Sequence, residues 1–254
     1  MTKIKKNKNK GGFIINTIKF ENKGNIKMVA HRGVSGLERE NTCPAFVAAG
    51  VKSYFGIETD VFVTLDEKYI IHHDADLMRI SGIDMAVKES TFDDLRAVRF
   101  TDIDGITPRG DMFLPSLEEY LSICRKYGKE AYLEICEVDL RKHVLGMAAV
   151  VEQMGMMEST TFISFNRSNL TDLRSAYPDA KAQLLTGELN EETIDFIIKN
   201  NIDAGIYFPA LTREFVELMH EHGRIVNVWT VDTLEDAERM RDMGVDVITS
   251  NILE

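Results

Sequence analysis

The chain alternates between short apolar runs and amphipathic helical patterns, and this alternation restricts its possible folds more than any other feature. Strands are expected at 28–30, 56–63, 131–136, 161–165, 181–185, 205–208, 225–230 and 245–250. Helices are expected at 41–52, 116–127, 140–154, 167–177, 191–199, 213–221 and 234–243. About eight strand–helix repeats predict a (β/α)8 barrel of the α/β class, and a doubly wound open sheet is the alternative.

The barrel is expected to occupy residues 28–254 as one domain, because 254 residues is an ordinary length for that fold. An insertion at about 74–115 follows the second strand, and it contains turn signals and a short helix candidate at 91–98. Residues 1–27 hold eight lysines and one acidic residue. We expect this basic N-terminal segment to be partly disordered, with 14–20 as a strand that closes the barrel floor.

The strand at 56–63 carries two acidic residues, Glu58 and Asp60, among apolar neighbours. Side chains alternate between the two faces of a strand, so both carboxylates point the same way. Two carboxylates on one apolar strand repel each other and are costly to bury unless a cation lies between them. A hard divalent ion is the simplest candidate, and a half-exposed strand with a polar face is the alternative.

A third carboxylate, Glu134, lies in the apolar strand at 131–136. A glutamate on the buried side of a strand needs a partner. Together with Glu58 and Asp60 it forms an oxygen-only ligand set, which suits Mg²⁺ or Ca²⁺ and does not suit zinc. A structural salt bridge is the alternative role for Glu134.

Two histidines follow apolar runs at the ends of predicted strands: His31 comes after 28–30, and His73 comes after 69–72. A lone histidine is more often structural, but two of them near a carboxylate pair fit general acid and base catalysis near neutral pH. Arg32 adds a planar cation suited to a phosphate. In a (β/α)8 barrel the carboxyl ends of the strands carry the active site, so these side chains are expected to meet there.

Several motifs, in order along the chain, make it resemble the glycerophosphodiester phosphodiesterase family. They are H-R-G at 31–33, E-N-T at 40–42, E-T-D-V at 58–61, H-D at 73–74, L-E-I at 133–135 and W-T-V at 229–231. The resemblance spans nearly the whole chain after residue 27. It implies a metal-dependent barrel that hydrolyses glycerophosphodiesters to sn-glycerol 3-phosphate and an alcohol, with the metal at Glu58, Asp60 and Glu134.

The resemblance also suggests a role for residues around the phosphate. It assigns His73 as the acid that protonates the leaving alcohol, although the sequence leaves open which of His31 and His73 is the acid and which is the base. Asn41 is expected to line the substrate site and anchor its loop near the phosphate. Trp229 is expected to pack over the glycerol, with a core position as the alternative.

One position departs from the family pattern. Family members usually carry a lysine two residues after the third metal-binding glutamate, and here that residue is Cys136. By strand parity Cys136 faces the same way as Glu134, so we expect it to line the substrate site without adding charge. Lys88, Arg79 and Arg109 in the insertion are candidates to supply that charge. A nucleophilic Cys136 has little support, because no activating histidine adjoins it in the sequence.

Two alternatives to glycerophosphodiester hydrolysis stay open. The first is action on lysophospholipids or another small phosphodiester, and the second is a non-catalytic phosphodiester-binding protein, which Cys136 favours. The complete set of histidines, Arg32 and carboxylates favours catalysis.

The composition restricts the partners and the compartment. Without residues 1–27, 22 basic and 40 acidic residues remain, a net charge of about −18, which argues against nucleic acid as a partner. Three cysteines without paired spacing indicate a reducing compartment, and we expect a cytoplasmic enzyme. No stretch approaches the roughly 20 apolar residues that cross a bilayer, so membrane contact is not expected. The sequence does not indicate an oligomeric state.

Overall fold

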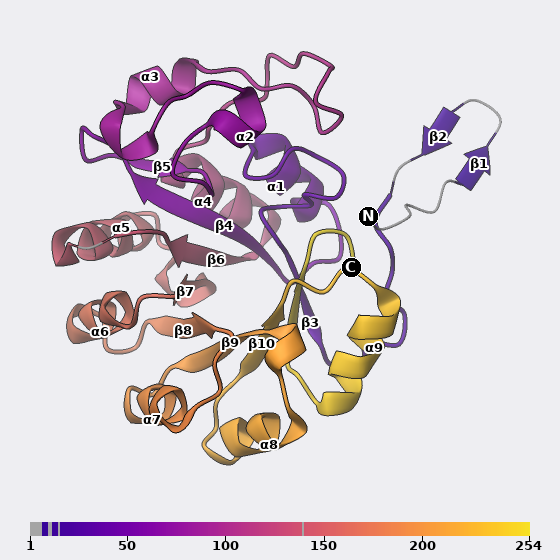
Figure 1. The fold of residues 1–254 in the computed structure, drawn as a ribbon, viewed down its shortest axis with the longest axis vertical. Helices are drawn as coiled ribbons and strands as arrows, with labels where there is room; N and C mark the ends of the chain where they lie inside the picture. Colours follow the sequence, from indigo (N-terminus) through magenta and orange to yellow (C-terminus); the bar gives the residue numbers. More distant parts are fainter. Residues whose placement is uncertain (1–6, 10–11, 15, 139) are drawn as a thin grey trace.

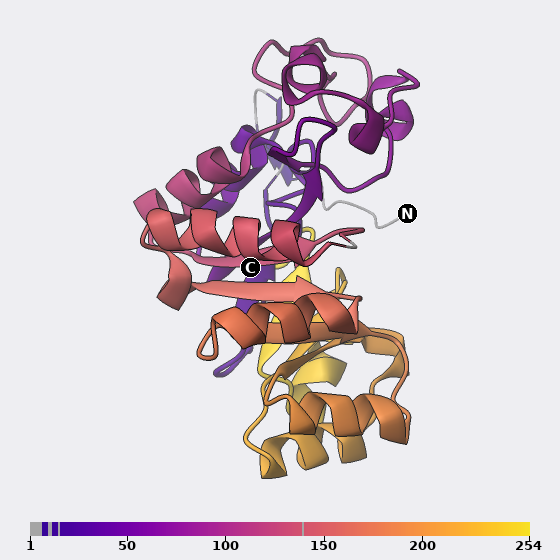
Figure 2. The ribbon, with the colours of Figure 1, turned by 90° about the vertical axis from the view of Figure 1, so that its left-hand side faces the viewer.

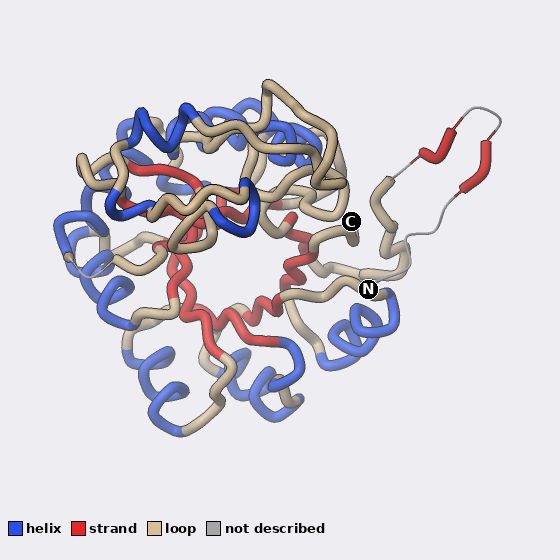
Figure 3. Tube along the Cα trace, turned by 45° about the horizontal axis from the view of Figure 1, so that its top comes forward, coloured by secondary structure: helices blue, strands red, loops and turns tan. Residues whose placement is uncertain are grey.

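A closed barrel of eight parallel strands forms the centre of the protein (Figure 3). The computed structural model describes residues 7–9, 12–14, 16–138 and 140–254. The order around the sheet is β3-β11-β10-β9-β8-β7-β6-β4, and β4 also pairs with β3, which closes the ring. The barrel strands are β3 (Lys27–Ala30), β4 (Gly56–Val63), β6 (Glu130–Ile135), β7 (Thr160–Ser164), β8 (Lys181–Thr186), β9 (Asp203–Tyr207), β10 (Val226–Trp229) and β11 (Val247–Ser250). The (β/α)8 prediction is confirmed, and the open-sheet alternative is wrong.

Helices between the strands cover the outside of the barrel (Figure 1). They are α1 (Cys43–Gly50), α4 (Leu117–Tyr127), α5 (Arg141–Gln153), α6 (Arg167–Ala176), α7 (Glu191–Lys199), α8 (Arg213–Glu221) and α9 (Leu234–Met243), with the short η2 (Met157–Ser159) and η3 (Phe208–Ala210). Most begin at a side chain that accepts a hydrogen bond from a backbone N–H of the first turn, which satisfies a donor that the helix leaves free. These capping residues are Thr42, Ser116, Asn166, Asn190, Thr212 and Thr233.

The inside of the barrel holds a small apolar cluster of Val29, Tyr132, Ile163, Leu185 and Val247, with Trp229 packed against it. A larger apolar cluster lies between the outer surface of the barrel and the helices. These two layers fix the strands, so the residues at their carboxyl ends project from a rigid rim.

The insertion forms a lobe beside the carboxyl end of β4 (Figure 2). β5 (Tyr69–Ile71) pairs antiparallel with that end, and α2 (Met78–Ser81), η1 (Val87–Glu89) and α3 (Phe92–Ala97) follow it. The lobe has an apolar core of its own, built from Phe62, Ile70, Leu77, Ile80, Val87, Leu95, Val98, Phe100, Met112, Leu114 and Cys136. This core holds the segment after β5, which carries His73, against the barrel.

The prediction of a strand at 14–20 that closes the barrel floor is wrong for residues 14 and 16–20. Residue 15 lies outside the described residues. Ile14 ends β2 (Gly12–Ile14), which pairs only with β1 (Asn7–Asn9) in a hairpin away from the barrel. Ile18 forms a single parallel bridge with Leu253, and the Phe20 N–H donates to the Glu254 carbonyl at 2.8 Å. The segment follows the C-terminal residues because Phe20 is buried in the outer apolar cluster. No helix in the described ranges is long and apolar enough to cross a membrane.

Candidate active site

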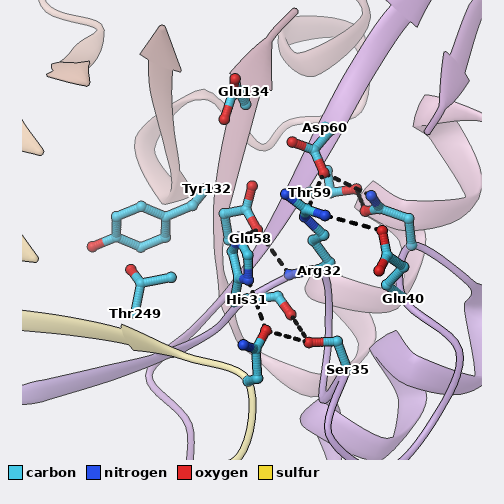
Figure 4. A network of polar contacts seen from close by, with 12 residues as sticks. His31, Arg32, Ser35, Glu40, Glu58, Thr59, Asp60, Tyr132, Glu134 and Thr249 are labelled. Carbon is cyan, nitrogen blue, oxygen red and sulfur yellow. Dashed lines mark hydrogen bonds and ion pairs between the residues drawn. The ribbon is translucent and has the colours of Figure 1, made fainter. Parts of the chain in front are cut away.

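The three predicted carboxylates lie on two neighbouring barrel strands (Figure 4). Parallel pairing of β4 with β6 places Asp60 beside Glu134 in register. A ligand atom from each of Asp60, Glu134 and Cys136 lies within 4.8 Å of the others. Glu58 is close enough to this group that Asp60 and Glu134 both raise its pKa. The barrel therefore brings Asp60 and Glu134 together from two strands, while Glu58 lies outside that 4.8 Å group and lines the same cavity as Glu134.

Burial makes this cluster electrostatically costly. Glu58 and Asp60 are 3% and 1% exposed. Burial first, and Asp60 second, raise the pKa of Glu58 well above its usual range and raise the pKa of Glu134 to about 8. In the part of the chain that the structure describes, the arginine in contact with the cluster is Arg32, whose Nε lies 3.2 Å from Asp60 Oδ2. Carboxylates that crowd together around one guanidinium fit a divalent cation with oxygen ligands.

Arg32 is held in a left-handed turn, with φ of 53°. Its backbone N–H donates to Glu58 Oε2 at 2.7 Å, and its Nη1 donates to Glu40 Oε1 at 3.0 Å. Such a conformation is uncommon for a residue with a side chain, and these two hydrogen bonds hold it. The buried Nε of Arg32 makes no hydrogen bond of good geometry. The guanidinium is therefore held between the carboxylates of Glu40 and Asp60.

Asn41 does not line the cavity, contrary to expectation. It is 2% exposed, its Nδ2 donates to Asp60 Oδ2 at 2.6 Å, and its Oδ1 accepts from Thr59 Oγ1 at 2.8 Å. The Asn41 backbone N–H also donates to the Arg32 carbonyl at 3.0 Å. Asn41 turns inward because its backbone is left-handed, with φ of 55°. It therefore orients a carboxylate and closes the Arg32 turn.

His31 is oriented by two residues that the sequence analysis missed, Asn251 and Asp232. Asn251 Nδ2 donates to Asp232 Oδ2 at 2.6 Å, and since a carboxylate only accepts, this contact fixes which way the amide points. Asn251 Oδ1 then faces His31 Nδ1 at 2.7 Å, so Nδ1 carries the proton. Nε2, 3.9 Å from Glu58 Oε2, is left with its lone pair. Burial, and then Arg32, lower the pKa of His31.

His73 has a different partner. Its Nδ1 lies 2.6 Å from Asp74 Oδ1, and Arg79 Nε donates to Asp74 Oδ2 at 2.6 Å. Arg79 also donates twice to Glu40, the residue that holds Arg32. The sequence places Asp74 next to His73, but the role of Asp74 depends on how the lobe formed by the insertion folds. The imidazole of His73 therefore has a carboxylate partner, whereas the imidazole of His31 has an amide partner.

Cys136 is nearly buried beside the carboxylates, with Sγ 3.5 Å from Glu134 Oε1 and 3.9 Å from Asp60 Oδ1. Burial, and then Glu134, raise the pKa of this thiol well above its usual range, which disfavours a nucleophilic thiolate. The three cations of the insertion that are candidates to replace the family's lysine are each paired with carboxylates. Lys88 pairs with Glu137 and Arg79 with Glu40 and Asp74, while Arg109 pairs with Glu38, Asp102 and Asp111.

A cavity of about 130 Å³ at the barrel mouth joins most of these groups. Its lining residues are His31, Arg32, Glu58, His73, Glu134, Ile163, Phe165, Leu185, Asn227, Trp229, Thr230 and Thr249. Trp229 is at its edge, donates through Nε1 to the Gly205 carbonyl at 3.1 Å, and meets the rings of Phe165 and Tyr207. The cavity thus has one charged side and one aromatic side.

A barrel whose mouth combines clustered carboxylates, an arginine and two imidazoles is the arrangement of a phosphodiesterase. The family model described as "Glycerophosphoryl diester phosphodiesterase family" matches residues 31–254. The chain belongs to this family.

Curated relatives and solved structures agree with this membership. The chain is 27% identical to the glycerophosphodiester phosphodiesterase of Bacillus subtilis (strain 168), with 94% of this chain and 90% of that protein covered. A crystal structure of a putative glycerophosphoryl diester phosphodiesterase from Silicibacter pomeroyi DSS-3 is 25% identical, with a TM-score of 0.82 over 89% of this chain and 90% of that one. An Oleispira antarctica phosphodiesterase in complex with the product sn-glycerol-3-phosphate has the same fold, with 21% identity and a TM-score of 0.82 over 89% and 92%.

Proposed function

We propose that this protein hydrolyses glycerophosphodiesters to sn-glycerol 3-phosphate and an alcohol, using a divalent cation and two histidines. The observation that carries the proposal is the convergence of His31, His73, Arg32 and two of the carboxylates, Glu58 and Glu134, on one cavity. The sn-glycerol-3-phosphate bound to the Oleispira antarctica phosphodiesterase supports the choice of product.

Glu58, Asp60 and Glu134 are the residues proposed to hold the cation. Their carboxylate oxygens suit Mg²⁺ or Ca²⁺. Asp60 and Glu134 offer ligand atoms within 4.8 Å of each other, and Asp60 and Glu134 both raise the pKa of Glu58, which supports their crowding around one ion. A cation held by these residues would offset charge that develops on the phosphoryl oxygens. Arg32, which lines the same cavity as both histidines, is proposed to hold another phosphate oxygen and so to orient phosphorus between them.

His31 is proposed as the general base. Its Nδ1 proton is engaged by Asn251, so Nε2 accepts a proton from the nucleophile, either water or a neighbouring substrate hydroxyl. The low pKa of His31 keeps the ring neutral near pH 7, which is the form that a base needs.

His73 is proposed as the general acid. Its contact with Asp74 through Nδ1 orients the ring, and His73 gives a proton to the oxygen of the departing alcohol. The two histidines therefore take their roles from their partners, an amide for one and a carboxylate for the other.

The direct test is release of sn-glycerol 3-phosphate from glycerophosphocholine, with EDTA and with each cation added back. We expect release with Mg²⁺ or Ca²⁺ and none with EDTA. A parallel panel with a lysophospholipid and other small diesters separates the alternative substrates. Tight diester binding without cation-stimulated cleavage would contradict the proposal in favour of a binding protein.

The cytoplasm is the proposed compartment. Cys43, Cys124 and Cys136 are all free thiols, which supports a reducing environment. A periplasmic or extracellular protein in fractionated cells would contradict this assignment.

A further inference from the structure

A second cavity adjoins the active-site cavity and shares three of its residues. Its volume is about 460 Å³, and His73, Glu134 and Phe165 line both cavities. Its remaining lining residues are Phe62, Ile135, Cys136, Glu137, Ser164 and Asn166. Phe165 and His73 thus stand at the boundary between the two cavities.

The sizes of the cavities suggest that a substrate occupies both. The active-site cavity, at about 130 Å³, is well below the roughly 300–1,000 Å³ of sites that enclose a whole organic ligand. Arg32 and Glu58 line this smaller cavity and not the larger one. The phosphate therefore belongs in the smaller cavity, and part of the diester must extend beyond it.

The position of His73 indicates which part extends. A general acid must lie within hydrogen-bond reach of the oxygen that it protonates, and that oxygen belongs to the departing alcohol. Of the two histidines, His31 lines only the smaller cavity, whereas His73 faces both. The alcohol accordingly leaves on the side of His73.

We propose that the second cavity holds the alcohol half of the diester, and that Phe165 and Glu137 select an alcohol with a positively charged nitrogen. This inference rests on the proposed function, and it assigns a role to residues that the catalytic mechanism does not use.

The lining of the cavity favours a cation. The Phe165 side chain is 55% exposed, so its ring is available for a cation–π contact. The Glu137 side chain is also 55% exposed, and its pairing with Lys88 at 3.1 Å is an exposed salt bridge of the kind that contributes little. Cys136 adds no charge to the cavity, and no lysine or arginine is among its described lining residues.

The test compares two esters of glycerol phosphate that have the same shape and differ in charge. One is the choline ester, and the other is the 3,3-dimethylbutyl ester, in which a carbon replaces the nitrogen. We expect the wild-type kcat/KM to favour the choline ester by about fivefold or more, the scale of one partly exposed cation–π contact. Phe165→Leu and Glu137→Gln should each move this ratio toward one.

Matched variants on other surfaces control for general effects. Phe55→Leu changes a partly exposed ring that lines the cavity at the opposite, amino-terminal end of the barrel. Glu67→Gln changes an exposed carboxylate that also pairs with a lysine, Lys142. Both controls should keep the wild-type ratio. Equal kcat/KM values for the two esters in the wild-type protein, or a ratio that Phe165→Leu and Glu137→Gln leave unchanged, overturn the inference.

A binding measurement separates this inference from the proposed function. Calorimetric titration of both esters into the His73→Ala variant with Mg²⁺ present measures their affinities without turnover. Preference for the choline ester supports the cation site even if the wild-type protein cleaves neither ester, a result that would contradict only the proposed hydrolysis. Equal affinities overturn the cation site even if both esters are cleaved.

Discussion

His31 Nδ1 lies 2.7 Å from Asn251 Oδ1, and the Asn251 amide is itself fixed by Asp232 at 2.6 Å. This chain of contacts links residues at the carboxyl ends of three barrel strands, β3, β10 and β11. It determines which nitrogen of His31 faces the carboxylates, and so whether His31 can act as a base.

Asn251→Ala should lower kcat by about tenfold or more, part of the 10²–10⁴-fold that a positioned acid or base contributes. The ring of His31 would lose its fixed orientation while the carboxylate cluster stays intact. Steady-state kinetics on glycerophosphocholine measure the loss, and Asn16→Ala on the surface is the control. An unchanged kcat in Asn251→Ala would remove this residue from the positioning of His31.

Asn251→Asp should move the acidic limb of the pH–rate profile to higher pH. The new carboxylate favours the charged form of His31 and raises its pKa, so the neutral base forms only at higher pH. A profile of kcat/KM from pH 5 to 9 measures the shift. If the acidic limb stays at the wild-type pH, His31 is not the group that produces it.

The sequence predicts the barrel well because each repeat carries its own local signals. The ranges expected for α7, α8 and α9 match those observed, since Asn190, Thr212 and Thr233 cap them and amphipathic periodicity runs to their last residue. The sequence predicts the carboxylates and histidines of the candidate site for a similar reason: strand parity and strand ends follow from the chain itself.

The contacts that orient the site could not be predicted in this way. Asn251 and Asp232 follow predicted strands but carry no motif, and the contact of Asn251 with His31 spans 220 residues of sequence. The left-handed backbone of Asn41, which turns that residue away from the cavity, is likewise set by tertiary contacts with Asp60 and Thr59. Sequence patterns place a residue at the site, but long-range contacts decide its role.

His73→Ala should lower turnover of glycerophosphocholine at least about 10²-fold, because the leaving alkoxide loses its proton donor. His31→Ala and Glu58→Ala should cause losses of similar size, and circular dichroism should show an intact fold in all three. A p-nitrophenyl ester separates the two histidines, since nitrophenolate leaves without a proton. His73→Ala should lose much less activity on that ester than His31→Ala does, and equal losses would contradict the assignment of His73 as the acid.

In the protein without bound metal, the free energy of unfolding should fall as the pH rises. The pKa of Glu134 is raised to about 8 in the folded protein, above its ordinary value of 4.5. The stability that its proton contributes is therefore fully present below pH 4.5 and is lost as pH rises through about 8. In EDTA, the Tm should drop between pH 6.5 and 8.5, by roughly 2–4 °C for each 1 kcal/mol in a domain of this size.

Added Mg²⁺ should reverse this trend, because it stabilises the deprotonated carboxylates and binds only the folded protein. The difference in Tm with and without Mg²⁺ should grow from pH 6.5 to 8.5. Glu134→Gln, which cannot titrate, should show a smaller drop in EDTA. Scanning calorimetry measures each curve, and a Tm in EDTA that rises over this pH range would contradict the burial of protonated carboxyl groups.

Gly33→Ala should destabilise the protein more than the same change at another left-handed glycine. Gly33 has φ of 74°, and a Cβ there would lie 2.7 Å from both the backbone carbon and the Cβ of Ala45 in α1. Gly24 has φ of 59° and open space around it. Gly24→Ala should therefore cost only the backbone strain of about 1–2 kcal/mol, whereas Gly33→Ala adds about 1–3 kcal/mol of overpacking. Urea unfolding measures both, and only Gly33→Ala should also reduce activity, because Arg32 in the same turn must move. Equal free energies of unfolding for the two variants would mean that α1 yields to the methyl group and that this contact does not hold the turn.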